Sequence, residues 1–416
     1  MNAPAELARR IVLAGLGAIG NGRLQVVEGR ASYGFGPTDA PLRATIEVHD
    51  PRAYPWALRG STGLGEGYIE GLWTVDDLVA LGRIACRNLA PLDRLRRRFH
   101  PLLGRLQRAA NLVPENTRKG ARRHISAHYD LGNRLFESFL DERLQYSAAV
   151  FSGPEASLDA AQLAKLERIC AALDLGPDDH LLEIGTGWGG LAIHAAETRG
   201  CRVTTTTISR EQHAYVAERI RERGLAERIE LLHTDYRDLT GSYDKLVSIE
   251  MIEAVGWQYF GEFFAKCAAL TRPGGAIFLQ AIVIGDEAYE AEKAASSFAN
   301  KHIFPGGCLP SLGLISRLGA ANGIPIVGCE EISDDYARTL AIWRDRFNDA
   351  WPALRPHGYD QRFHRLWNFY LAFSEGGFRE RRIRDLQIVL AKPGRRPEEA
   401  RWRSPTRERA AASLSS

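Results

Sequence analysis

Apolar and polar positions near the N-terminus follow the pattern of a small domain built from a helix and strands. Residues 1–20 carry a short apolar stretch among charged positions, which predicts an amphipathic helix and not a signal peptide. Residues 23–36 and 42–50 alternate apolar and polar side chains around glycine turns, which predicts strands. Gly60–Leu78 holds five glycines but is too apolar for a linker, so we expect a packed loop and then a helix from Thr74.

From about residue 150, apolar strands alternate regularly with amphipathic helices. Beyond the apolar strand that ends at Glu183, we expect strands at 202–208, 228–235, 243–250, 276–284 and 386–391, and helices at 158–173, 210–223 and 257–270. Ser209 is the expected N-cap of one helix, and Arg272–Gly275 is an expected turn. This alternation predicts an α/β fold with a parallel, doubly wound, Rossmann-like sheet, beside a smaller N-terminal α+β domain.

Ligands of such sheets bind at the carboxyl ends of the strands. The expected crevice is therefore lined by the segments Gly185–Gly189, Thr207–Gln212, Asp235–Tyr236, Glu250–Glu253 and Gln280–Ile282. An insertion at 286–347 precedes the last strand, and 343–373 is rich in Trp, Phe and Tyr. Aromatic helices of this kind are usually core, but they could also line a tunnel for an acyl chain.

Composition indicates a folded protein of ordinary type. Of the 416 residues, 45% are hydrophobic and 25% are charged, the formal net charge is +3, and no apolar run reaches the length of a transmembrane helix. Six scattered cysteines without a C-x-x-C pair argue against a zinc site and a disulfide framework, and suit a reducing cytoplasm.

Charge is concentrated in one stretch, residues 91–124, where arginines alternate with leucines near helical spacing. Such a basic amphipathic segment could lie on an anionic membrane surface, or it could be a solvated helix that links two domains. No motif supports nucleic-acid binding. Residues 393–416 are rich in Arg, Glu and Ser, and we expect them to be disordered.

The sharpest local signal is LLEIGTGWGG at 181–190, an apolar strand that runs into an acid and then into a glycine-rich turn. Glycines at a strand-to-helix turn let a ligand approach the backbone, but they also occur at NAD and FAD sites and in structural turns. The spacing E-x-G-x-G-x-G, with Glu183 two residues before Gly185, is typical of the first loop of an S-adenosylmethionine (AdoMet) methyltransferase.

Ten motifs together resemble the cyclopropane-fatty-acyl-phospholipid synthase family. In chain order they are GLGEGYIEGLW, HYDLGN, YSAAVF, LEIGTGWGGLA, TTTTISREQ, DYRDL, SIEMIEAVG, NKHIFPGGCLPS, DDYARTL and FRERRIRDLQIV. The resemblance implies an AdoMet-dependent enzyme that acts on unsaturated acyl chains of membrane phospholipids. It divides the chain into a lipid-engaging domain (1–90), a basic linker (91–124), a catalytic domain (125–392) and a tail (393–416).

Carried over by position, the resemblance implies eight AdoMet contacts and a base. The AdoMet contacts fall on Tyr146, Ser147, Gly185, Gly187, Thr207, Gln212, Asp235 and Tyr236. In the family the base is a bicarbonate ion, held by a cysteine, a glutamate, a histidine, an isoleucine backbone and a tyrosine. The glutamate, isoleucine and tyrosine are present as Glu253, Ile282 and Tyr336.

Two of these five positions differ, because Ala148 replaces the cysteine and Gln280 replaces the histidine; Ala254 replaces a second family histidine. Bicarbonate is therefore a possible but doubtful ligand. Gln280 can donate a hydrogen bond but carries no positive charge. Glu253 could act as the base itself or through water, with Tyr336 as a relay. The alternative is a purely structural role for Glu253, as an acidic residue at a helix N-terminus that interacts with the helix dipole.

Cyclopropane and methyl- or methylene-branched products remain equally open. The resemblance to the branched-chain members rests on MIEAVG and LQAI. We expect a peripheral enzyme at the cytoplasmic face of an anionic membrane, and a homodimer is plausible from the family. Two rival functions also stay open: a soluble small-molecule methyltransferase, and a lipid-binding protein with a decayed site.

Overall fold

The chain forms two compact units that combine separate stretches of sequence. A computed structural model describes residues 3–89, 116–117, 132–293 and 295–394. Unit 1 comprises Met1–Pro114, Glu287–Gly307 and Ala337–Ile383, and unit 2 comprises Glu115–Asp286, Cys308–Tyr336 and Arg384–Ser416. The expected basic linker and C-terminal tail lie almost entirely outside the described residues. Within these residues no helix has the length and apolar character needed to cross a bilayer.

Unit 1 is an α+β unit built on a four-stranded sheet. Its strands are β1 (Arg23–Glu28), β2 (Ala31–Phe35), β3 (Arg43–Val48) and β4 (Trp73–Val75), in the order β2-β1-β3-β4. Its helices include α1 (Ala3–Leu16), α2 (Ala53–Ala57), α3 (Gly60–Ile69), α4 (Leu78–Asn88), α13 (Phe298–His302) and α16 (Gln361–Arg379). Most of α12 (Asp286–Glu292) and α15 (Ser333–Leu354) also belongs to unit 1, but Asp286 and residues 333–336 belong to unit 2. The expected N-terminal helix and the strands after it are confirmed.

The glycine-rich segment of unit 1 is helical, so the loop expected there is wrong. Helix α3 places Gly63 against the carbonyl oxygen of Trp56 and Gly65 against the rings of Phe298 and Phe369. The helix expected from Thr74 is wrong as well: Thr74 lies in β4, and α4 begins after Asp77, whose carboxylate caps it. Glycine lowers intrinsic helix propensity, but here it permits close helix packing, which supplies the stability.

Unit 2 is a doubly wound α/β unit, as expected. Its seven strands are β5 (His180–Ile184), β6 (Arg202–Thr206), β7 (Ile229–Leu232), β8 (Tyr243–Ile249), β9 (Thr271–Ile284), β10 (Ile326–Glu331) and β11 (Ile383–Ala391). Their order is β10-β11-β9-β8-β5-β6-β7. Strands β7, β6, β5, β8 and β9 are parallel to their neighbours within this run, and β10 is antiparallel to β11. The carboxyl ends of the parallel strands therefore share one edge.

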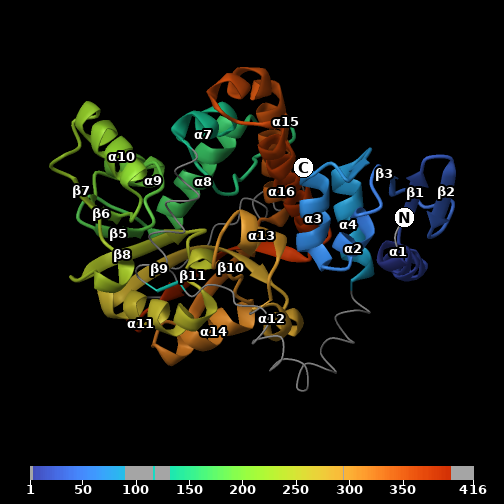
Figure 1. Cartoon of the computed structure of the whole chain (residues 1–416). Coiled ribbons are helices and arrows are strands. Elements are labelled where there is room, and N and C mark those ends of the chain that lie inside the picture. Colours follow the sequence, from blue (N-terminus) through green and yellow to red (C-terminus); the bar gives the residue numbers. More distant parts are fainter. Residues whose placement is uncertain (1–2, 90–115, 118–131, 294, 395–416) are drawn as a thin grey trace, which may run out of the picture. The chain divides into compact units, whose positions relative to one another are not determined.

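Helices cover both faces of this sheet. Figure 1 shows α8 (Leu158–Leu173), α9 (Gly190–Arg199) and α10 (Arg210–Glu222) on one face, and α11 (Phe260–Leu270) and α14 (Leu312–Ala321) on the other. A short helix, α7 (Asn133–Phe139), precedes α8. The core on the first face joins α8 and α9 to the sheet through Leu166, Ile169, Leu181, Leu191 and Val203. Ser209 caps α10 through a hydrogen bond from the Gln212 backbone, as expected.

The expected turn at Arg272–Gly275 is part of β9. Tyr243 pairs with Thr271 and Lys245 with Ala276, so these residues form an irregularity within the β8–β9 ladder. The long aromatic helices are core elements: the side chains of Trp343, Trp367 and Phe369 are all at most 1% exposed. Of the two interpretations left open for this aromatic segment, burial in the core is the one these three residues support.

The glycine packing in unit 1 predicts the effect of Gly63→Ala. A Cβ on Gly63 would lie 1.8 Å from the Trp56 carbonyl oxygen, so α2 and α3 must move apart. We expect the substitution to destabilise the protein by about 1–3 kcal/mol, seen as a lower midpoint of thermal unfolding. The control is Gly15→Ala in α1, where a Cβ would meet nothing within 4 Å. Equal unfolding midpoints for the two variants would contradict this packing argument.

Candidate active site

The glycine loop between β5 and α9 leaves room for a ligand at one position. Gly185, Gly187 and Gly189 all have positive φ angles (+97°, +53° and +84°), which residues other than glycine rarely adopt. A Cβ on Gly187 would meet nothing within 4 Å, whereas one on Gly185 would lie 3.0 Å from the Met251 side chain. The backbone around Gly187 is therefore open to close approach by a ligand.

Glu183, the acid that sharpened the glycine motif, stabilises the strands under the loop. Its carboxyl group accepts a hydrogen bond of 2.5 Å from the hydroxyl of Thr205 on the neighbouring strand. Burial raises the pKa of Glu183 to about 8, so the group is mainly protonated at neutral pH. In this structure Glu183 links β5 to β6.

At the end of β6, Thr207 and Gln212 are bonded to each other. The Thr207 hydroxyl donates to Oε1 of Gln212 at 2.8 Å. The amide Nε2 of Gln212 has no hydrogen bond to any described residue, so it can donate to an oxygen of a ligand. This arrangement is compatible with the predicted cofactor contact of Gln212.

Beyond β7, Asp235 and Tyr236 have different surroundings. The carboxylate of Asp235 forms a bidentate ion pair with Arg237: Nε donates to Oδ1 at 2.8 Å and Nη2 donates to Oδ2 at 2.7 Å. The hydroxyl of Tyr236 is buried and has no hydrogen-bond partner among the described residues. A buried hydroxyl without a partner carries a free-energy penalty that a bound ligand could remove.

A buried lysine that the sequence analysis missed holds the segment of Tyr146 and Ser147. Lys165 is fully buried in α8, and its ammonium donates to the Ser147 hydroxyl at 2.6 Å. Burial lowers the pKa of Lys165 to about 8, against the attraction of nearby carboxylates. The signal was present in the sequence, because Lys165 shares one helical face with apolar Leu158, Ala161 and Ile169.

Glu250 is the centre of the site, and it too was missed as a functional residue in its own right. Its Oε1 accepts from the Ala148 backbone N–H at 2.8 Å and from Nε2 of Gln280 at 2.7 Å. Its Oε2 accepts from the Tyr336 hydroxyl at 2.6 Å. Glu250 also has a φ angle of +44°, a strained value for a glutamate at the end of β8.

Tyr336 and Gln280 are thus brought together by Glu250. The sequence analysis paired Tyr336 with Glu253 as a relay, but the one proton of the Tyr336 hydroxyl is donated to Glu250. Gln280 also donates to Oδ2 of Asp385 at 3.0 Å and accepts from Gln387 at 3.0 Å. Asp385 and Gln387 come from β11, which is distant in sequence. The motif FRERRIRDLQIV contains both residues, but the sequence analysis gave neither of them a role in the site.

Glu253 and Ile282 form a second pair next to this network. Oε1 of Glu253 accepts from the Ile282 backbone N–H at 2.6 Å. Its Oε2 is buried without a hydrogen-bond partner among the described residues. Burial, helped by the negative charge of Glu250, raises the pKa of Glu253 to about 8.

The three carboxyl groups of Glu250, Glu253 and Asp385 cannot all be ionised beside one buried lysine. Burial raises the pKa of each of them, and the charge of Glu250 raises the pKa of the other two further. Hydrogen bonds from three donors and the charge of Lys165 favour the ionised form of Glu250. We conclude that Glu250 carries the negative charge and that Glu253 and Asp385 hold protons.

This assignment predicts a pH-dependent stability for Glu253. Between the ordinary glutamate pKa near 4.5 and about 8, the folded protein keeps a proton that the unfolded chain releases. Stability from this group is therefore complete below pH 4.5 and is lost as the pH rises toward 8. Glu253→Gln should reduce that loss by the order of a few kcal/mol, measured by urea unfolding from pH 5 to pH 8. The same slope in wild type and variant would contradict a protonated Glu253.

Comparison with known proteins places this site in a family. The model of the mycolic acid cyclopropane synthetase family matches residues 116–388. The tuberculostearic acid methyltransferase UfaA1 of Mycobacterium tuberculosis is 36% identical over 364 residues, which cover 85% of this chain and 84% of that protein. The cyclopropane-fatty-acyl-phospholipid synthase of Escherichia coli K12 is 35% identical over 355 residues, 84% of this chain and 88% of that protein.

A solved structure agrees with these relatives. The mycolic acid cyclopropane synthase CmaA1 complexed with SAH and CTAB has a TM-score of 0.61 and 26% identity, and covers 65% of this chain and 98% of its own. The open Gly187 backbone, the available Gln212 amide and the Tyr236 hydroxyl all fit an AdoMet molecule at the strand ends. The chain therefore belongs to the mycolic acid cyclopropane synthetase family, and it is an AdoMet-dependent methyltransferase that converts lipid acyl chains to cyclopropane or methyl-branched products.

Proposed function

We propose that this chain methylates the cis double bond of an unsaturated phospholipid acyl chain and releases a methylene-branched acyl chain, with Glu250 as the proton acceptor. One observation carries the proposal. The carboxylate of Glu250 lies among the Ala148 N–H, the Gln280 amide and the Tyr336 hydroxyl. These are three of the positions that the family resemblance assigns to a bound bicarbonate.

The donors at this position are already satisfied by the protein, so a separate bicarbonate does not fit there. Glu250 uses both of its oxygens to accept hydrogen bonds of 2.6 to 2.8 Å from the three groups. A second anion at the same place would meet the charge of Glu250 and would find no free donor among these three. We infer that the chain carries its own base and that no step needs bicarbonate.

The site also protects the cation that forms on the acyl chain from water. AdoMet, when bound, supplies an electrophilic methyl group. A double bond that accepts this group is left with a positive charge on the neighbouring carbon, which water would trap. Ala148, Gln280 and Asp385 are each 0% exposed. Glu250 and Glu253 are only partly exposed as whole residues, and Oε2 of Glu253 is itself buried, so bulk water has little access to that carboxyl group.

Glu250 can serve this cation in two ways. Its negative charge, held in a poorly solvated place, stabilises the positive charge on the acyl chain. It can then accept the proton that must leave. Tyr336 and Gln280 orient the carboxylate through their hydrogen bonds, and Gln387 fixes the orientation of the Gln280 amide.

The fate of the proton decides the product. If the charge stays on the neighbouring carbon, loss of a proton from the new methyl group closes a cyclopropane. If a hydride first shifts to that carbon from the methylated carbon, loss of a proton from the new methyl group leaves a methylene branch (C=CH2) on the chain. A saturated methyl branch would need a further hydride donor. The proposal of a branched product is supported by the similarity to the tuberculostearic acid methyltransferase and by the substituted bicarbonate ligands Ala148 and Gln280.

We also propose that the enzyme works at the cytoplasmic face of an anionic membrane. Helix α1 of unit 1 exposes Leu7 (61%) and Ile11 (49%) one turn apart, beside the ion pair of Arg10 with Glu6 at 3.3 Å. An amphipathic helix of this kind can lie in the lipid–water interface. Homodimerisation, which the family resemblance made plausible, stays a prediction.

The product is tested by incubating the full chain with AdoMet and vesicles of a mono-unsaturated phosphatidylglycerol, prepared without bicarbonate. We expect the acyl chain to gain one CH2, and its NMR spectrum to show vinylidene protons. High-field cyclopropane protons in place of the vinylidene signals would show that the product is a ring, and would contradict the proposed branched product. If product formed only after bicarbonate was added to this mixture, the proposed role of Glu250 as the base would be contradicted.

Two variants of Glu250 separate its charge from its volume. Glu250→Gln should lower kcat by about 10²–10⁴-fold, because the base is lost while the amide still fills the position. Glu250→Gly should be as slow, but added bicarbonate should restore part of its activity, since the three donors are then free. Glycine also suits the φ of +44°. Wild-type kcat in Glu250→Gln would overturn the proposal.

Gly187→Ala tests the cofactor position. A Cβ would enter the open space beside the loop, at a backbone φ of +53°. We expect the affinity for S-adenosylhomocysteine, measured by calorimetry, to fall by about tenfold or more, because ligand and methyl group compete for the same space. The matched control is Gly224→Ala, at a φ of +65° with nothing within 4 Å, away from the loop. Equal affinities in the two variants would place the cofactor elsewhere.

A further inference from the structure

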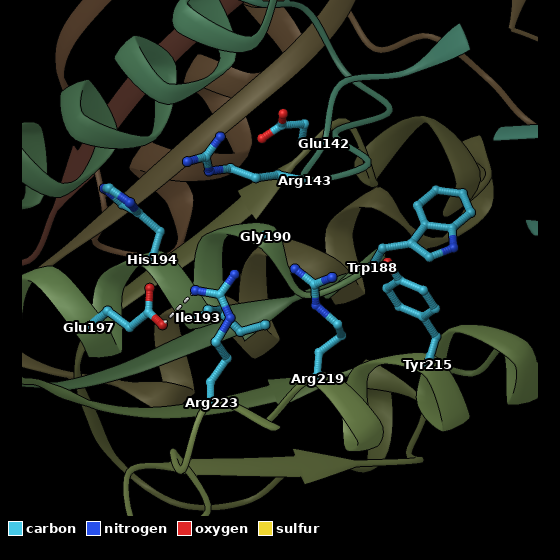
Figure 2. A pocket seen from close by; sticks show the side chains of 10 residues that line it. All are labelled: Glu142, Arg143, Trp188, Gly190, Ile193, His194, Glu197, Tyr215, Arg219 and Arg223. Carbon is cyan, nitrogen blue, oxygen red and sulfur yellow. Dashed lines mark hydrogen bonds and ion pairs between the residues drawn. The ribbon is translucent and has the colours of Figure 1, made fainter. Parts of the chain in front are cut away.

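A hollow in unit 2 lies outside the carboxylate network. It is a pocket of about 270 Å³, and Figure 2 shows the side chains that line it. They are Glu142, Arg143, Trp188, Gly190, Ile193, His194, Glu197, Tyr215, Arg219 and Arg223. None of these residues belongs to the predicted AdoMet contacts or to the Glu250 network. The pocket is therefore a separate feature of the methyltransferase unit.

Two helices build the pocket by presenting one face each. Tyr215, Arg219 and Arg223 are spaced four residues apart along α10 and its C-cap, so they project on the same side. Gly190, His194 and neighbouring positions of α9 form the facing wall. Figure 2 shows Arg219 and Arg223 reaching from α10 toward the side that carries Arg143.

The arginines of the pocket are incompletely neutralised. The Arg143 side chain makes no hydrogen bond or ion pair with any described residue. The Arg219 guanidinium lies over the Tyr215 ring, 5.9 Å from its centroid. Only Arg223 is paired with an acid of the pocket, Glu197, at 3.1 Å. A cation on an aromatic face keeps most of its capacity to donate hydrogen bonds.

The other titratable groups of the pocket do not cancel this charge. Glu142 is exposed to solvent, and Glu197 is engaged by Arg223. His194 lies 2.9 Å from Glu167 through Nε2, and burial lowers its pKa, so it adds no cation at neutral pH. Three arginines thus face two glutamates, which leaves a surplus of positive charge in a concave site.

We propose that this pocket binds a phosphate ester, with the phosphate on Arg143 and Arg219. The planar guanidinium group matches two phosphate oxygens at once, which makes arginine the preferred partner of this anion. The partly exposed Tyr215 offers apolar surface to the organic part of the ester, and the buried Trp188 and Ile193 complete the apolar lining. The ester could be the headgroup of a phospholipid or a soluble molecule such as glycerol phosphate.

The pocket shares one wall with the glycine loop. Trp188 follows Gly187 directly, and its indole N–H donates to Oδ1 of Asn133 at 3.1 Å. The Trp188 ring packs on Phe136 with centroids 4.7 Å apart, and Phe136 contacts Tyr146 at 5.4 Å. A phosphate ester in the pocket would therefore sit beside the predicted cofactor loop without occupying it.

The test is a calorimetric titration of the full chain with glycerol 3-phosphate. We expect binding by the wild type, and about tenfold weaker binding after Arg219→Gln or Arg143→Gln, because each removes a charge-assisted hydrogen-bond donor. The matched control is Arg221→Gln, on the same helix, where Arg221 pairs with Glu218 and does not line the pocket. Unchanged affinity for S-adenosylhomocysteine in all three variants confirms that unit 2 is folded.

Sedimentation with phosphatidylglycerol vesicles then distinguishes the two sources of the ester. If Arg219→Gln weakens both glycerol 3-phosphate binding and vesicle binding relative to Arg221→Gln, the ester is a lipid headgroup. If only the soluble ester is affected, the ligand is a soluble molecule. No binding by the wild type, or the same affinity in Arg219→Gln and Arg221→Gln, would overturn the proposal. Neither measurement involves turnover, so both are independent of the proposed product.

Discussion

Placing several carboxyl groups around one buried lysine is the constraint on which the active site depends. Asp385 and Lys165 are fully buried, and Glu250 and Glu253 are shielded from most of the solvent. An ionised carboxylate in such surroundings needs hydrogen bonds and an opposite charge, or else it takes up a proton. Glu250 obtains three donors, whereas Glu253 obtains one from a backbone amide. The number of donors therefore decides which carboxyl group keeps its charge.

The sheet makes this arrangement possible because it brings distant residues to one edge. Glu250 follows β8, Gln280 lies in β9 and Asp385 lies in β11, and these three strands are adjacent in the order β11-β9-β8. Tyr336 comes from the start of α15, and Lys165 reaches the same region from α8. A side chain that is positioned by a strand or helix on a packed sheet is held more rigidly than one on a free loop. Such rigidity suits the proposed reaction, in which a cation on the acyl chain meets one base and no water.

Chemistry and packing place opposite demands on glycine in this molecule. In the loop after β5, Gly187 leaves space that a ligand can use. In α3, Gly63 and Gly65 leave space that other parts of unit 1 already fill. Composition alone does not distinguish these cases, and the α3 segment was therefore misread as a loop. The difference arises because a helix stabilised by tertiary contacts tolerates residues of low helix propensity.

Much of the fold could be read from the sequence, because it rests on local patterns. Alternating apolar strands and amphipathic helices predicted the doubly wound sheet, which the structure confirms, and the E-x-G-x-G-x-G spacing predicted a cofactor loop between β5 and α9. The tertiary structure decided which acid is the centre of the site. Glu250 and Glu253 are the same residue type three positions apart, so the sequence does not distinguish their roles. The contacts from Ala148, Gln280 and Tyr336, which only Glu250 makes, distinguish them. The surroundings of Lys165, Asp385 and the arginine pocket are likewise set by groups that folding brings together. Burial and the interaction of charges on distant residues leave no local pattern in the sequence, so they could not be predicted from it.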